Sequence, residues 1–257
     1  MSYMAGERGG DTVIKIVVGV IVAVVLLFGA AYWFANRTQS PEDLQADIDG
    51  AIQDDKVNGP LLLELKATYP ADYQTYTKLL IDLHQRGASE MEVRSASQAL
   101  SRQLAMSHGA DFRVAPTAAL FKVRDGNLGV IRALKAESSD MCAHFAMTGL
   151  SPTDRPSRRT MLRMTQVGVD QVRAMAAGRA KPFKRGKPTQ SDVMALRKEM
   201  LAQGSTAAEF DAMVQGTAMG MPLDRQCMLG VALYQSLVNM EEGPSDRLSA
   251  MLLLPEQ

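Results

Sequence analysis

The sequence predicts an all-α protein in which a single amino-terminal transmembrane helix precedes an irregular multi-helix domain. Past residue 36, apolar residues recur three and four positions apart, and runs of valine and isoleucine are largely confined to residues 16–35. The 46% of hydrophobic residues is sufficient for a core in a chain of 257 residues. Seventeen methionines and only 5% aromatic residues indicate aliphatic, flexible packing between helices.

Residues 16–35 read IVVGVIVAVVLLFGAAYWFA, without a charged or strongly polar side chain. A helix of this length covers about 30 Å, the hydrocarbon thickness of a bilayer, and satisfies its own backbone in lipid. Side chains typical of the membrane interface occur at its two ends: Lys15, Tyr32, Trp33 and Phe34. A cleaved secretory signal is the main alternative, because residues 28–31 resemble a cleavage site, but the apolar part of a signal is normally shorter. A buried soluble helix is disfavoured because nothing polar interrupts any face.

The flanking charges predict the orientation of this segment. Arg8 and Lys15 precede it, whereas Arg37 is the one basic residue shortly after it. The positive-inside rule then makes residues 1–15 a short cytoplasmic tail and residues 36–257 an exported domain. In a bacterium, the chain would be a single-pass inner-membrane protein with a periplasmic domain.

Capping residues, prolines and glycines set the first expected helices of the exported domain. Ser40-Pro41-Glu42-Asp43 begins one helix, with acids at the positive end of its dipole. Tyr73 and Tyr76 lie on one face of another helix, which ends at Gly87. Ser89-Glu90-Met91-Glu92 is a capping box that opens the next, so the last two should form an antiparallel hairpin.

Turn signals divide the rest of the chain. Pro116 begins a helical region that we expect to break at Asp125-Gly126-Asn127. A linker at 151–156, a long amphipathic helix ending near Gly178 and an exposed basic loop at 179–188 follow. The last expected elements are helices at 190–203, 206–219 and 222–241 and a short amphipathic tail after residue 244. The tetratricopeptide repeat pattern is absent.

The stretch SSDMCAHFAMTG contains one of two cysteines and one of three histidines in the chain. On a helix, Cys142 and His144 point about 200° apart, which disfavours a nucleophile and base pair. Asp140 and His144 share a face, but no further ligand cluster completes a metal site. In an oxidising compartment, Cys142 should pair with Cys227 and contribute about 4 kcal/mol of stability. In the reverse orientation, both would be buried free thiols.

Two oppositely charged regions lie within a chain of zero formal net charge. Residues 42–72 contain eight acids and two lysines, and residues 151–187 contain ten bases and two acids. These fields could pair within the fold, join copies or steer partners. The candidate binding surface is basic: Arg158, Arg159, Lys181, Lys184, Arg185 and Lys187. It could be a solvated connection, or it could bind anionic lipid headgroups or cell-wall polymers. A nucleic-acid contact is disfavoured, because Phe183 is the one aromatic residue of the loop that could stack on a base.

The sequence lacks the phosphate-binding loop, HExxH pair, nucleophile elbow and EF-hand loop. We therefore predict no catalytic residues, no metal and no cofactor. The expected function is that of a membrane-anchored envelope protein with a non-catalytic binding or assembly domain. Expected partners are the lipid bilayer and other envelope proteins or anionic envelope polymers, not nucleic acid. The alternative is a membrane-anchored hydrolase of cell-wall or lipid material; lateral assembly through Gly19 and Ala23 is a third possibility.

Overall fold

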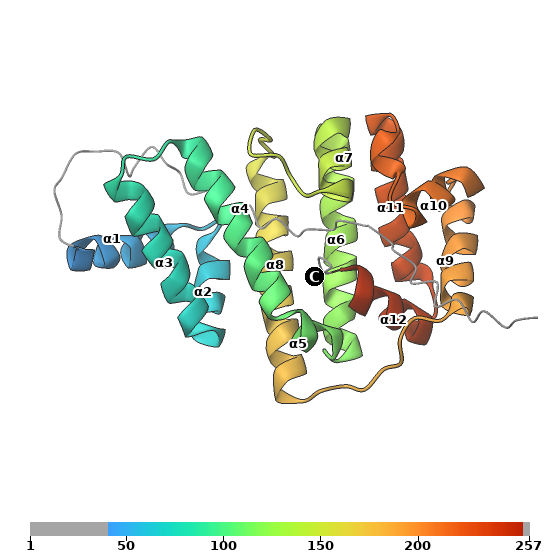
Figure 1. The fold of residues 1–257 in the computed structure, drawn as a ribbon, viewed down its shortest axis with the longest axis horizontal. Coiled ribbons are helices and arrows are strands. Elements are labelled where there is room, and N and C mark those ends of the chain that lie inside the picture. Colours follow the sequence, from blue (N-terminus) through green and yellow to red (C-terminus); the bar gives the residue numbers. More distant parts are fainter. Residues whose placement is uncertain (1–40, 254–257) are drawn as a thin grey trace, which may run out of the picture.

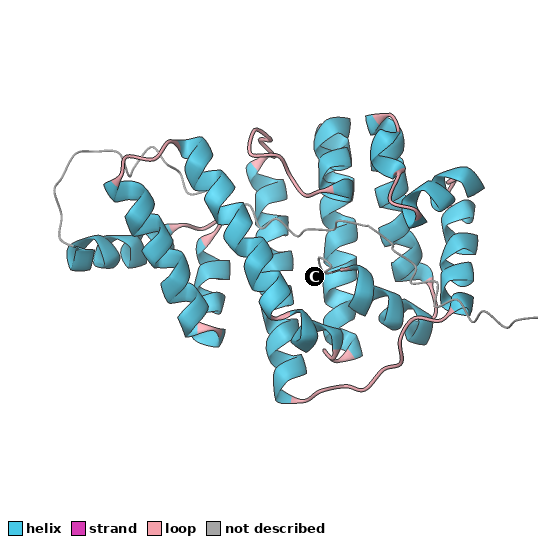
Figure 2. Ribbon diagram, in the orientation of Figure 1, coloured by secondary structure: helices cyan, strands magenta, loops and turns pink. Residues whose placement is uncertain are grey.

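The structure, a computed structural model, describes residues 41–253. This part of the chain is all-helical and contains no strand (Figure 2). In chain order its elements are α1 (Pro41–Asp54), α2 (Gly59–Thr68), α3 (Pro70–Gln85), α4 (Glu90–Ser107), α5 (Gly109–Arg113), α6 (Thr117–Glu137), α7 (Ser139–Met147), α8 (Arg158–Ala180), α9 (Gln190–Ala202), α10 (Ala207–Val214), the 3-10 turn η2 (Ala218–Gly220), α11 (Leu223–Asn239) and α12 (Glu242–Leu252).

Across residues 41–253, no helix is both long and apolar enough to cross a membrane. The predicted span at 16–35 lies outside the described residues, as do its expected interface residues Lys15, Tyr32, Trp33 and Phe34. The all-helical character of the domain is therefore confirmed, and the anchor stays a prediction.

The helices are arranged side by side along the long axis of the molecule (Figure 1). Helices α1–α4 form one end, α9–α12 form the other, and α6 and α8 lie side by side between them. The long helix α8 contacts α2 and α5 as well as α6, so it joins the amino-terminal helices to the rest. One hydrophobic core runs from Leu44 in α1 to Leu253.

Short polar side chains start several of these helices in the way their sequences predict. Ser89 and Glu92 form the expected capping box of α4. The same motif begins α9 at Thr189 and α10 at Thr206. Each box satisfies backbone N–H groups that a helix leaves without partners in its first turn. Gly87, with a φ of +66°, then makes the turn between α3 and α4, which run in opposite directions (Figure 1).

The expected break at Asp125-Gly126-Asn127 is wrong, because α6 continues unbroken to Glu137. Gly126 lies against α8, where an added Cβ would approach Val167 Cγ2 to 2.7 Å. Asn127 is fully buried. Gly126 therefore permits close packing of α6 on α8, and tertiary contacts outweigh the local turn preference.

Other boundaries also differ from the predictions. Helix α2 was not expected as a separate element, and only Tyr69 separates it from α3. The helix expected at 206–219 ends at Val214, because Gly216 adopts a φ of +71° and the chain turns into η2. The last helix begins before Pro244, which lies in its first turn, where proline is tolerated.

Glycines allow two of the closest helix contacts. A Cβ on Gly178 of α8 would clash with the carbonyl oxygen of Asp111 in α5. A Cβ on Gly230 of α11 would clash with the side chain of Ala146 in α7. Neither neighbour can move far, since one is backbone and the other is a short side chain on a packed helix. The second contact brings α11 and α7 together one turn away from Cys227.

Candidate functional site

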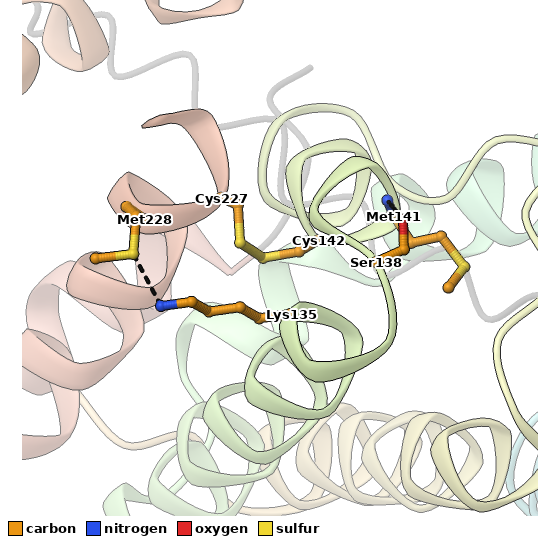
Figure 3. Close-up of a disulfide and its surroundings, with 6 residues drawn as sticks. All are labelled: Lys135, Ser138, Met141, Cys142, Cys227 and Met228. Atoms are coloured by element: carbon orange, nitrogen blue, oxygen red, sulfur yellow. Dashed lines mark hydrogen bonds between the residues drawn. A yellow bond between two sulfur atoms is a disulfide. The ribbon is translucent and has the colours of Figure 1, made fainter. Parts of the chain in front are cut away.

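A disulfide joins α7 to α11 (Figure 3). Cys142 and Cys227 are bonded, with Cα atoms 5.1 Å apart, and both side chains are almost completely buried. This Cα separation lies within the range that disulfides require. The pairing expected from the sequence is therefore present in the structure, and it ties the middle of the domain to its carboxyl-terminal helices.

In the disulfide, Cys142 has no free thiol that could act as a nucleophile or metal ligand. Helix α7 includes both Cys142 and His144, so their side chains diverge as predicted. His144 Nδ1 lies 3.0 Å from the carboxylate of Asp154, in the linker before α8. Within residues 41–253, no group of three or more His, Cys, Asp or Glu side chains is arranged to hold a metal ion.

The six basic residues expected to form one surface lie in two places. Arg158 and Arg159 are exposed at the start of α8, and Lys181, Lys184 and Lys187 are exposed just beyond its end. A helix of 23 residues separates the two groups by roughly 33 Å. In Figure 1 the start of α8 is at the upper edge and the loop that follows it runs along the lower edge. The structure therefore does not bring the six together.

The sixth residue, Arg185, is directed inward and only 7% of its side chain is exposed. Its guanidinium donates hydrogen bonds to the carbonyl oxygens of Arg113, at 2.6 Å, and Ala115, at 2.5 Å. The backbone N–H of Phe183 donates to the carbonyl of Val114 at 2.8 Å. Arg185 and Phe183 thus fasten the loop to the segment between α5 and α6.

A buried ion cluster lies beneath the loop. Arg124 of α6 donates to Asp246 of α12 at 2.6 Å, and both side chains are at least 94% buried. The hydroxyl of Thr117 also donates to this carboxylate, and Arg185 approaches it to 4.0 Å. Burial lowers the pKa of the Arg185 guanidinium, and the charge of Asp246 opposes that shift. The cluster connects α6, α12 and the loop through charge-assisted hydrogen bonds.

The remaining side chains of the loop face solvent. Lys181, Lys184 and Lys187 are exposed, and none of them is paired with an acid of residues 41–253. The ring of Phe183 is 49% exposed and packs on the guanidinium of Arg185, with 5.0 Å from its centroid to Arg185 Cζ. We name Lys181, Phe183, Lys184 and Lys187 the basic loop surface. This surface combines positive charge with an apolar ring, and hydrogen bonds from Arg185 and from the Phe183 backbone fix the loop to residues 113–115.

Asp192 also supports this region, because it follows the loop at the start of α9. Arg247 donates two hydrogen bonds to its carboxylate, at 2.7 and 2.8 Å, and the backbone N–H of Thr189 donates a third. The hydrogen bonds from Arg247 are the largest cause that lowers the pKa of Asp192, from 3.8 to about 2. The carboxylate is therefore ionised in the folded protein at all but the most acidic pH.

This pKa shift predicts a pH dependence of stability. A carboxylate whose pKa is lower in the folded state stabilises the fold fully above its unfolded pKa near 4, and loses that contribution as the pH falls towards 2. The contribution of Asp192 is about 2 kcal/mol. In urea unfolding between pH 5 and pH 2, the variant Asp192→Asn should lose less stability than the parent. Parallel pH profiles for the two proteins would contradict this assignment.

A histidine that the sequence did not single out has acidic partners at the amino-terminal end of the molecule. His108 Nε2 lies 2.7 Å from Asp72, and Nδ1 lies 3.8 Å from Asp111. Its ring packs on Tyr69, with 4.0 Å between centroids, and Arg179 covers the ring of Tyr69. Each ring nitrogen of His108 therefore faces a carboxylate. The cluster joins α3, α5 and α8.

Some acids of the acidic region, residues 42–72, are paired with bases inside the fold. Glu64 of the acidic region accepts two hydrogen bonds from Arg173 of α8, at 2.7 and 3.0 Å. Asp49 accepts hydrogen bonds from Lys66 and from the hydroxyl of Tyr73. These contacts neutralise acids of α1 and α2, whereas the lysines of the basic loop surface remain without such partners among the described residues.

Comparison of the chain with protein-family models, with curated proteins and with solved structures finds no match in any of the three.

Proposed function

We propose that this chain is a single-pass envelope protein whose helical domain is a non-catalytic binding module. The apolar stretch at 16–35 would anchor it in the inner membrane, with the domain on the extracytoplasmic side. The bonded, buried cysteines support an oxidising location, since such bonds rarely persist in the cytosol. Envelope components with negative charge would be its partners.

The observation that carries the proposal is the fixed presentation of the basic loop surface. Arg185 donates hydrogen bonds to two carbonyl oxygens inside the molecule and so holds the loop between α8 and α9 in place, while the three lysines of the loop are exposed. Three exposed ammonium groups on one short loop attract polyanions and raise their local concentration. A surface held in place also loses less conformational entropy on binding than a mobile segment does.

The chemistry of the buried acids is less suited to the alternative, a membrane-anchored hydrolase. Within residues 44–253, the buried carboxylates are Asp192 and Asp246. Both accept hydrogen bonds from arginine, Asp192 from Arg247 and Asp246 from Arg124. Hydrolysis by a carboxyl pair needs one acid with a raised pKa, whereas Arg247 lowers that of Asp192.

A charge-removal experiment with a matched control tests the proposal. We expect the triple variant Lys181→Gln, Lys184→Gln, Lys187→Gln to lose at least tenfold in co-purification with anionic envelope material at low salt. The matched variant Arg158→Gln, Arg159→Gln, Arg163→Gln removes the same charge from the other end of α8 and should retain it.

Quantification of lipid and polymer in affinity-purified full chain from solubilised membranes is the measurement. Equal losses in both triple variants would show that net charge and not this surface attracts the partner. Undiminished recovery in both would contradict the proposed binding function.

A further inference from the structure

We propose that the partner of the basic loop surface is an anionic phospholipid bilayer, on which the loop and the adjoining part of α6 dock. This inference rests on the proposed function and makes it more specific. Three observations support it. Apolar rings accompany the lysines, and these rings pack on arginines of the buried ion cluster. The tether expected between the domain and its anchor is short.

Two exposed aromatic rings accompany the positive charges. Phe183 packs on Arg185, and Phe121 of α6, which is 43% exposed, packs 5.0 Å from the Cζ atom of Arg124. Arg124 and Arg185 both approach Asp246, so the two rings pack on guanidiniums of the same buried cluster. Lys122, next to Phe121, is exposed as well.

This combination distinguishes a lipid surface from a soluble polyanion. Ammonium groups pair equally well with phosphates of either kind. An aromatic ring is stabilised in the interfacial layer of a bilayer, because its apolar face is transferred out of water. Lysines flanked by exposed phenylalanines are therefore better matched to headgroups above acyl chains than to a hydrated polymer.

The expected anchor increases the occupancy of such a contact. Only five residues separate position 35, where the predicted span ends, from Pro41, where α1 begins. Fully extended, they reach at most about 20 Å. Tethering at this distance makes docking intramolecular, at an effective concentration in the millimolar range. Three lysines close to an anionic surface would then favour the docked loop by roughly a hundredfold.

Tryptophan fluorescence in reconstituted full-length protein tests the inference. The substitution Phe183→Trp, in a chain whose single native tryptophan is replaced by Trp33→Phe, places the probe in the loop. The protein is incorporated into vesicles of brominated phosphatidylcholine, with or without about one-third phosphatidylglycerol. Quenching by bromine reports contact between the probe and the acyl chains.

We expect blue-shifted, strongly quenched emission in the anionic vesicles only, reversed by about 0.5 M salt because surface electrostatics are screened. Adding Lys181→Gln, Lys184→Gln and Lys187→Gln should abolish the quenching, whereas Arg158→Gln, Arg159→Gln and Arg163→Gln should leave it intact. Far-UV circular dichroism checks that each variant is folded, and the salt titration tests the parent without any charge substitution.

Equal emission in anionic and neutral vesicles would overturn the inference. So would retention of quenching in the triple-lysine variant. If soluble polyphosphate binds in a lysine-dependent way while the probe stays unquenched in anionic vesicles, the lipid assignment fails and the proposed binding function stands. If the triple-lysine variant changes binding of neither the anionic vesicles nor polyphosphate, both the lipid assignment and the proposed binding function fail.

Discussion

Replacing Asp246 with asparagine should lower the free energy of unfolding by about 3–5 kcal/mol, the largest effect expected of any single substitution considered for this domain. Asparagine keeps the size of the side chain but removes the charge that faces Arg124, whose side chain is 3% exposed. The guanidinium would then be a buried cation with only a neutral partner. Urea unfolding of the purified chain in mild detergent, followed by circular dichroism, measures the change.

A double-mutant cycle separates the loss of this ion pair from general damage to the core. Arg124→Met removes the buried cation, so Asp246→Asn should cost much less in that background than in the parent. Glu64→Gln is the control, because its partner Arg173 is 60% exposed and a surface pair contributes about 0–1 kcal/mol. Additive effects in the cycle would show that Arg124 and Asp246 do not stabilise each other.

Removing the disulfide is the second large effect expected. The bond closes a loop with a sequence separation of 85 residues, and constraint of the unfolded chain predicts a contribution of about 4 kcal/mol. The double variant Cys142→Ala, Cys227→Ala should lose this stability with little change in helix content. Alanine is suitable because both cysteines are buried, and it is small and apolar.

Reduction provides an independent control for this prediction. Because the sulfur atoms are buried, a reductant should act slowly on the folded protein and quickly in urea. It should destabilise the parent by the same amount as the double substitution and leave the double variant unaffected. A parent whose urea midpoint is the same with and without reductant would contradict a stabilising bond.

The elements that the sequence predicted well are those whose signals are local. The box at Ser89 and the capping threonines Thr189 and Thr206 each satisfy backbone groups within one turn, so they start helices in almost any context. The Pro-rich linker at 151–156 and the basic loop likewise follow from residues that disfavour helix continuation. The cysteine pairing was predictable because the chain contains a single pair.

The incorrect predictions depend on contacts between distant segments. Gly126 lies inside α6 and does not end it. The position lacks a side chain because Val167 of α8 occupies the space that a Cβ would fill. Arg185 resembles the other bases of its loop in sequence, and only the fold directs it to the carbonyls of Arg113 and Ala115. Most residues of α12 around Asp246 are apolar or small. Its partner Arg124 is 122 positions away in the sequence. No local pattern could identify that pair.

The measurement that tests the central claim most directly is thiol labelling from outside the membrane. A cysteine placed in the basic loop by Lys184→Cys should react with a membrane-impermeant maleimide in intact spheroplasts. The native pair should remain bonded and unreactive. A cysteine placed in the tail by Ser2→Cys should react only after lysis. Labelling of the tail and protection of the loop in intact spheroplasts would place the helical domain in the cytoplasm and contradict the account.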